Sequence, residues 1–86
     1  MSLMKYTAIS YNDVKVKTWT APQFFPGVEE ESVNNFVTGV ERTCSLGRIA
    51  PENEGIDCYK IGFFDDETGI FERCEPVFLI RLENKA

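Results

Sequence analysis

The stretch of sequence that decides the fold runs from residue 56 to residue 74, IDCYKIGFFDDETGIFERC. Apolar and aromatic residues on both sides of its centre predict two strands, 56–64 and 70–74. Between them lies the segment Asp65-Asp66-Glu67-Thr68-Gly69, which has the composition of a hairpin turn. The stretch therefore predicts an antiparallel β-hairpin with Gly69 at the position that needs a positive φ.

Further strands are expected on both sides of this hairpin. Residues 77–82 (VFLIRL) predict a last strand, which Glu75-Pro76 separates from the one before it. Near the N-terminus, residues 4–11 and 14–20 predict a second hairpin that turns at Asn12-Asp13. Strict alternation in the segment 14–20 (VKVKTWT) places Val14, Val16 and Thr18 on one side and Lys15, Lys17 and Trp19 on the other.

A single helix is expected between the two hairpins. Residues 21–27 (APQFFPG) contain two prolines and a glycine and predict a rigid connector. The run Glu29-Glu30-Glu31 then suits the first turn of a helix, and Arg42 suits its last turn. The apolar residues recur at helical spacing and form one stripe: Val33, Phe36, Val37, Val40 and Cys44. Residues 45–55 predict a loop.

These elements predict an α+β fold with the order β-β-α-β-β-β. We expect an antiparallel sheet of about five strands with one helix packed on one face. The 86 residues suffice for one domain, placed at residues 4–83. We interpret residues 1–3 as a cloning leader and residues 84–86 as a polar tail. No apolar stretch approaches the ~20 residues that span a bilayer and no signal peptide is visible, so we expect a cytosolic protein without a membrane role.

The composition excludes several classes of function. Nine basic residues face fourteen acidic ones, and the net charge of −5 argues against coating nucleic acid by bulk charge. The chain has no histidine, which removes the commonest general base and the usual partner of a nucleophilic serine or cysteine. Three cysteines, Cys44, Cys58 and Cys74, form no metal-binding motif and are expected in the core. We expect no enzyme, no catalytic residue, no metal and no cofactor.

One candidate site is the alternating segment of the first hairpin. Lys15 and Lys17 could meet the phosphates of a single nucleic-acid strand while the ring of Trp19 stacks on a base. The alternative is that these residues form only the solvent face of an amphipathic hairpin. The candidate nucleic-acid-binding residues are therefore Lys15, Lys17 and Trp19.

Other segments are candidates for binding a protein partner. Phe24 or Phe25 could be an exposed anchor, although such a pair more often packs in the core. Asp65, Asp66 and Glu67 could bind a cation or a basic partner, but adjacent carboxylates do not converge on one ion, and a solvated turn explains them. The run Glu29-Glu30-Glu31 could also mimic nucleic acid or bind a basic partner, but its place at a helix N-terminus explains it fully.

The order of these motifs resembles a known viral family. A hairpin leads to Ala21-Pro22-Gln23-Phe24-Phe25-Pro26, a helix follows, and a later strand ends in Gly62-Phe63-Phe64-Asp65-Asp66-Glu67-Thr68-Gly69. Over most of residues 4–75 this pattern resembles the small nonstructural protein of gokushoviruses, the microviruses related to the Chlamydia phages. The chain departs from the family in lacking histidine and in separating Pro51-Glu52 from Asp57-Cys58-Tyr59.

The resemblance implies a role in replicating a single-stranded DNA genome, at the switch from duplex to single-strand synthesis, and it implies no catalytic residues. We therefore expect a non-enzymatic phage protein that binds single-stranded DNA weakly, without sequence preference, and as a homodimer that covers open strand edges. The alternative is a protein-interaction module that binds a host or phage replication protein.

Overall fold

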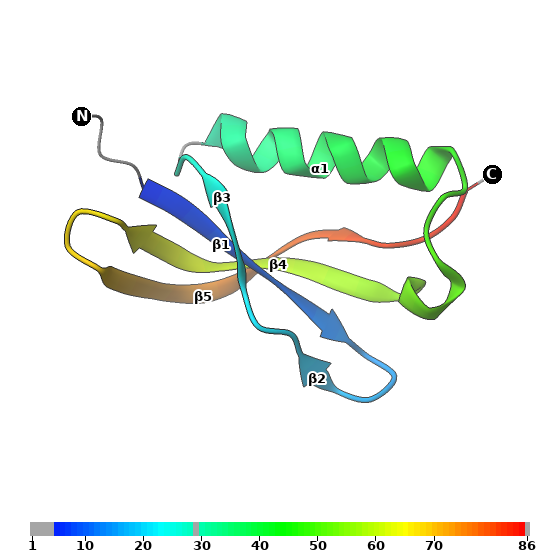
Figure 1. Cartoon of the computed structure of the whole chain (residues 1–86). Coiled ribbons are helices and arrows are strands. Elements are labelled where there is room, and N and C mark those ends of the chain that lie inside the picture. The colour runs from blue at the N-terminus through cyan, green and yellow to red at the C-terminus, as the bar shows by residue number, and fades with distance from the viewer. Residues whose placement is uncertain (1–4, 29, 86) are drawn as a thin grey trace.

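The computed structural model describes residues 5–28 and 30–85, and it has the predicted α+β architecture (Figure 1). The expected leader at residues 1–3 lies outside the described residues, as do Met4, Glu29 and Ala86. One antiparallel sheet has the strand order β2-β1-β4-β5, and β3 pairs with β1 on the same side as β2. One helix, α1, lies along one face of this sheet.

The hairpin predicted around residues 65–69 forms the long arm of the sheet. Strands β4 (Ile56–Asp65) and β5 (Ile70–Arg81) pair antiparallel, and the turn is closed by a hydrogen bond of 2.8 Å from the Gly69 amide to the Asp65 carbonyl. Gly69 has φ +72°, as the sequence predicts. The Asp65 side chain also accepts a hydrogen bond from the Glu67 amide, which fixes the turn locally.

The predicted break at Glu75-Pro76 is wrong, because β5 continues through it as one strand of 12 residues. The pairing is instead interrupted by a bulge. Gly62 pairs with Arg73 and Lys60 pairs with Val77, so three residues of β5, 74–76, lie opposite Ile61 alone. A proline is tolerated in such a bulge at the edge of a sheet. Bulge residues are not paired, so no carbonyl of β4 loses a hydrogen bond because proline lacks an N–H.

The first hairpin also differs from its prediction. β1 (Lys5–Asp13) extends through the expected turn, residues 14–17 form the loop, and β2 is only Thr18–Trp19. The Lys15 amide donates to the Asp13 carboxylate, and Lys17 adopts φ +56°. This local hydrogen bond closes the loop, whereas the alternating valines Val14 and Val16 remain 43% and 63% exposed. Alternation alone did not make a strand here.

The predicted connector contains a strand. Residues Gln23–Pro26 form β3, in which Phe25 pairs with Thr7 and Phe24 with Ala8. The stretch between β2 and β3 is held by Thr20, whose carbonyl accepts a hydrogen bond from the Ser10 hydroxyl. Pro22 and Pro26 lie just before β3 and at its end, on the outer edge of the sheet, where they cost no ladder hydrogen bond.

The helix α1 (Glu30–Ser45) confirms the predicted stripe. Its stripe residues are buried or half-buried, and Glu30 and Arg42 occupy its first and last turns. The helix ends in a Schellman motif, in which the amides of Gly47 and Arg48 donate to the carbonyls of Cys44 and Thr43. A short 3-10 turn, η1 (Pro51–Asn53), follows in the predicted loop.

The C-terminal residues are tied to this loop. The Asn84 side chain accepts a hydrogen bond of 2.8 Å from the Ile49 amide and donates one of 2.8 Å to the Ile49 carbonyl. The Lys85 amide donates to the Cys44 carbonyl, at the end of the helix. The chain therefore clamps the C-terminal end of α1 to the end of β5. In the described part of the chain, no helix has the length and apolar character needed to cross a membrane.

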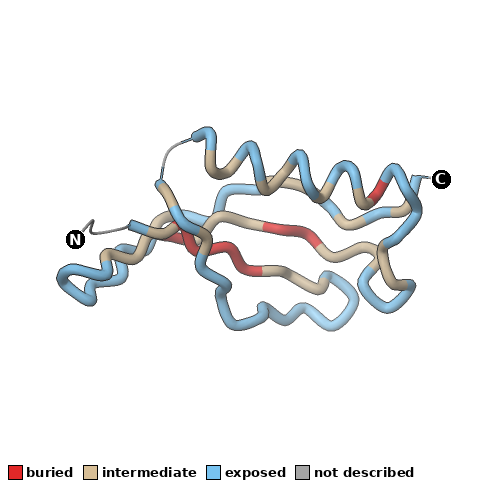
Figure 2. The backbone as a smooth tube through the Cα atoms, turned by 45° about the horizontal axis from the view of Figure 1, so that its top comes forward, coloured by how far each residue is buried: buried red, intermediate tan, exposed pale blue. Residues whose placement is uncertain are grey.

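Burial is concentrated under the helix and in the centre of the sheet. Figure 2 shows the buried residues as short segments of two strands and one point near the end of α1; the apolar ones are Ala8, Ile9, Cys44 and Cys58. The chain exposes 5950 Å², several hundred Å² more than the roughly 5,200 Å² expected of a compact monomer of 9.8 kDa. Its radius of gyration is 13.8 Å, against about 12 Å for a compact chain of this length. Large side chains of the sheet, among them Trp19, Phe24 and Phe78, remain about half-exposed, so part of the sheet surface has no cover.

Candidate nucleic-acid interface

The uncovered surface is the face of the sheet opposite α1. Phe24 and Phe25 are neighbours in β3 and point to opposite faces. Phe25 packs against Phe36 of the helix, with ring centroids 5.2 Å apart, whereas Phe24 contacts Phe64 and Phe71 on the other side. We call this second side the aromatic face, which comprises Tyr6, Trp19, Phe24, Tyr59, Phe64, Phe71 and Phe78.

The central feature of the aromatic face is a row of three rings, the Trp19 row. The centroids of Trp19 and Tyr59 lie 5.0 Å apart, and those of Tyr59 and Phe78 lie 5.7 Å apart. These residues come from β2, β4 and β5, so the row crosses the sheet. Ser10, a small residue of β1, pairs with Tyr59 of β4. Its size leaves room for the rings of Trp19 and Tyr59 to meet above it. Trp19 is 50% exposed and Phe78 54% exposed.

A second group of rings lies further along the same face. Phe64 contacts both Tyr6 and Phe24, and Phe24 also contacts Phe71. The small residues Ala8 and Gly62 pair with each other between these rings. The aromatic face thus follows a simple pattern, in which small residues at the centre of the sheet are flanked by rings that lean over them.

The candidate lysines lie in the loop beside the Trp19 row. Lys15 and Lys17 are not on a strand face with Trp19, contrary to the alternation in the sequence, because residues 14–17 form the loop between β1 and β2. Both side chains are exposed, and a methyl group at Gly55 would lie 3.6 Å from Cε of Lys15. Along the chain, Thr18 alone separates Lys17 from Trp19, so the loop that carries both lysines leads directly into β2.

The charges on this side of the molecule differ from the net charge of the chain. Arg73 and Glu75 line a groove beside the Trp19 row, and Arg81 forms an ion pair with Asp57. The loop between β1 and β2 adds Lys15, Lys17 and Asp13, so four basic residues face three acidic ones, a local charge of +1 against −5 for the whole chain. Most other acidic residues lie in α1, in the loop after it or in the β4–β5 turn.

The ion pair anchors the end of the row. Nε of Arg81 lies 2.6 Å from Oδ1 of Asp57, and Nη2 lies 3.2 Å from Oδ2, so the two groups bond through two atoms each. Asp57 is buried, whereas half of the Arg81 side chain is exposed. The hydrogen bond to Asp57, followed by the carboxylate charge, raises the pKa of Arg81. Arg81 therefore stays charged and partly accessible at the edge of the aromatic face.

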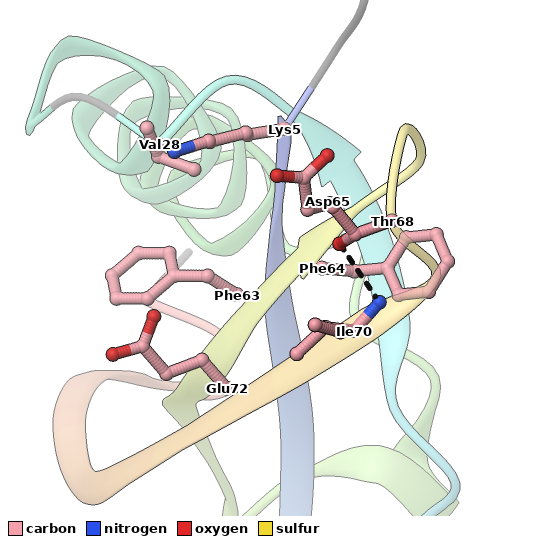
Figure 3. A pocket seen from close by; sticks show the side chains of 8 residues that line it. All are labelled: Lys5, Val28, Phe63, Phe64, Asp65, Thr68, Ile70 and Glu72. Atoms are coloured by element: carbon pink, nitrogen blue, oxygen red, sulfur yellow. Dashed lines mark hydrogen bonds between the residues drawn. The ribbon is translucent and has the colours of Figure 1, made fainter.

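The candidate protein-binding residues lie in two places. Phe24 is 47% exposed on the aromatic face, and Phe25 is packed against the helix. Asp65 lines a second groove of about 440 Å³ at the end of the sheet, which we call the end groove (Figure 3). Phe63 and Val28 form apolar walls of the end groove, and Lys5 and Glu72 add charges. Asp66 and Glu67 lie exposed in the adjoining turn.

The cysteines lie in or near the core, as predicted. Cys44 and Cys58 are buried and Cys74 is half-buried, and all three are free thiols. Burial, reinforced by the charges of Asp57 and Cys44, raises the pKa of Cys58 to about 12. Such a thiol is protonated and poorly nucleophilic at neutral pH. Among residues 5–28 and 30–85, no group of three or more acidic or sulfur ligands could hold a metal ion.

Sequence reasoning found Trp19 but missed most of its neighbours. Tyr59 and Phe78 lie 40 and 59 positions away, and only the strand pairing brings them to Trp19. The sequence did hold one signal for Tyr59. Cys58 is expected in the core, and because neighbouring residues of a strand point to opposite faces, Tyr59 belongs on the other face of the sheet. Comparison of the chain with protein-family models, with curated proteins and with solved structures found no match.

Proposed function

We propose that this domain binds single-stranded DNA through the aromatic face, by contact and without catalysis. The observation that carries the proposal is the Trp19 row, three adjoining rings of which the outer two are half-exposed. Exposed rings on a sheet serve as a stacking platform for unpaired bases. Each stacked base contributes about 1–3 kcal/mol, whatever its identity.

Charge supports the same surface. Phosphates are repelled by a chain of net charge −5 at long range, but Lys15, Lys17, Arg73 and Arg81 offer cations along or beside the aromatic face. Double-stranded DNA keeps its bases stacked in the helix and cannot use such rings. The combination therefore favours weak binding of single strands over binding of duplex.

The biological setting follows from the resemblance to the gokushovirus nonstructural protein. We propose that the domain acts in the replication of a single-stranded phage genome in the host cytoplasm, where newly made single strands must be bound. A homodimer would double the contacts and raise avidity. Prolines and bulges blunt both sheet edges, at Pro22 and Pro26 on one side and Pro76 on the other. Pairing of copies through the edges is therefore less favoured, and a dimer that raises avidity must leave the aromatic face of both copies open.

The proposal is tested by the salt dependence of binding. Each phosphate that a protein cation neutralises on a single strand contributes about 0.7 to the slope of log affinity against log salt. The double variant Lys15→Ala/Lys17→Ala should therefore lower the magnitude of this slope by about 1.4. The control is Lys5→Ala/Lys85→Ala, which removes the same charge from exposed lysines outside the Trp19 row. An equal slope for wild type and the first variant would contradict the proposed role of the loop lysines.

A second candidate function is the binding of a host or phage replication protein at the end groove. The groove combines the ring of Phe63 with the carboxylates of Asp65 and Glu72, which suits an apolar side chain next to a basic one. A pull-down with the replication proteins of the host and phage tests this candidate. It predicts a stoichiometric partner that the variant Asp65→Ala/Glu72→Ala releases and that Trp19→Ala keeps, and recovery of no such partner would refute it.

A further inference from the structure

A groove of about 490 Å³ opens on the aromatic face directly beside Trp19, and we call it the bulge groove. It exists because three residues of β5, 74–76, lie opposite Ile61 alone, so the β5 backbone bends away from β4. Its apolar walls are Trp19, Ile61, Phe71 and Pro76, and its charged groups are Arg73 and Glu75. The volume lies within the roughly 300–1,000 Å³ of pockets that hold small ligands.

We infer that the bulge groove takes one base of the bound strand and favours a base that carries an exocyclic amino group. This inference rests on the proposed binding of single-stranded DNA. A strand that stacks on the Trp19 row passes the mouth of the groove, since Trp19 belongs to both. The apolar walls suit the flat faces of a base, and Arg73 offers donors to the phosphate that carries it.

The preference comes from the carboxylate of Glu75. A carboxylate only accepts hydrogen bonds, so it pairs with the amino group of cytosine, adenine or guanine. Thymine presents a carbonyl oxygen at the corresponding place, and two acceptors repel each other. Charge assistance makes such hydrogen bonds stronger than neutral ones. The groove therefore adds a base preference to a platform that would otherwise bind all bases alike.

Cytosine and thymine give the sharpest comparison, because both are single-ring bases of similar size. We expect wild type to bind labelled oligo-dC about five- to tenfold more tightly than oligo-dT of equal length, measured by fluorescence anisotropy at low salt. In Glu75→Gln the side-chain amide can donate as well as accept, so the two affinities should agree within about twofold.

The matched control is Glu72→Gln, which removes the same charge from a residue of the end groove. It should leave the ratio of oligo-dC to oligo-dT affinity at the wild-type value. Equal binding of both oligonucleotides by wild type would overturn the base preference and leave the proposed function standing. A preference that Glu75→Gln keeps would also overturn the inference. Failure of wild type to bind either oligonucleotide would overturn the proposed function and the inference with it.

Discussion

Gly62 is the position where a single methyl group should disturb the sheet most. It is buried in β4, opposite Arg73, where the β5 backbone and the ring of Phe71 approach it closely. A Cβ at this position would overlap the carbonyl oxygen of Glu72 and lie 2.8 Å from Cζ of Phe71. A ring can turn away, but the Glu72 carbonyl belongs to the strand pairing and can move only with β5.

We expect Gly62→Ala to destabilise the fold by about 1–3 kcal/mol, the usual cost of adding a methyl group to a packed site. For a domain of this size, each kcal/mol lowers the melting temperature by roughly 4–8 °C. Thermal unfolding followed by far-UV circular dichroism measures the change. The substitution should also displace the ring of Phe71, which lines the bulge groove, and so widen this groove.

Gly39 supplies the matched control. It is exposed in the middle of α1, and a Cβ there would meet nothing within 4 Å. Gly39→Ala should therefore stabilise the helix by roughly 0.5–1 kcal/mol and raise the melting temperature. A melting temperature of Gly62→Ala equal to that of wild type, or above it, would refute the close approach of β4 and β5.

Further predictions follow from the burial of single residues. In the native protein a thiol reagent should label Cys74 rapidly and should reach Cys44 and Cys58 only after denaturant is added; rapid native labelling of all three would contradict the packing of α1 on the sheet. Because the folded pKa of Cys58 is raised from 9.0 to about 12, its contribution to stability is complete below about pH 9 and is lost as the pH rises toward 12, which a series of melting temperatures checks. Phe78→Ala should weaken single-strand binding by about 1–3 kcal/mol with little change in melting temperature, whereas Ile70→Ala, similarly exposed but outside the Trp19 row, should leave binding unchanged.

The sequence predicted elements whose signals are local. The apolar stripe of α1 repeats at helical spacing over three turns. Gly69 ends a turn in which the Asp65 carboxylate accepts a hydrogen bond from the nearby Glu67 amide. Both predictions are confirmed. The α+β class and the helix on one face follow from these signals together with the order of the elements.

One failure has a local cause, and the others come from pairing between distant segments. Residues 14–17 alternate like a strand, yet a hydrogen bond between Lys15 and Asp13 closes them into a loop. Phe24 and Phe25 lie between prolines, yet they form a strand because β1 pairs with them. The prolines are tolerated because this strand, β3, lies at the edge of the sheet. The bulge at residues 74–76 and the row that joins Trp19 to Tyr59 also depend on register, which local sequence does not determine.

The most direct test of the account follows the emission of Trp19, the only tryptophan of the chain, during titration with oligo-dC. Stacking of a base on the half-exposed indole should quench this emission at about 20 mM salt, and the quenching should weaken steeply at about 200 mM. An unchanged emission at low salt would contradict binding through the aromatic face. Sedimentation of the same sample as a dimer, with Trp19 emission already shifted to the blue, would show that a second copy covers this face in place of DNA.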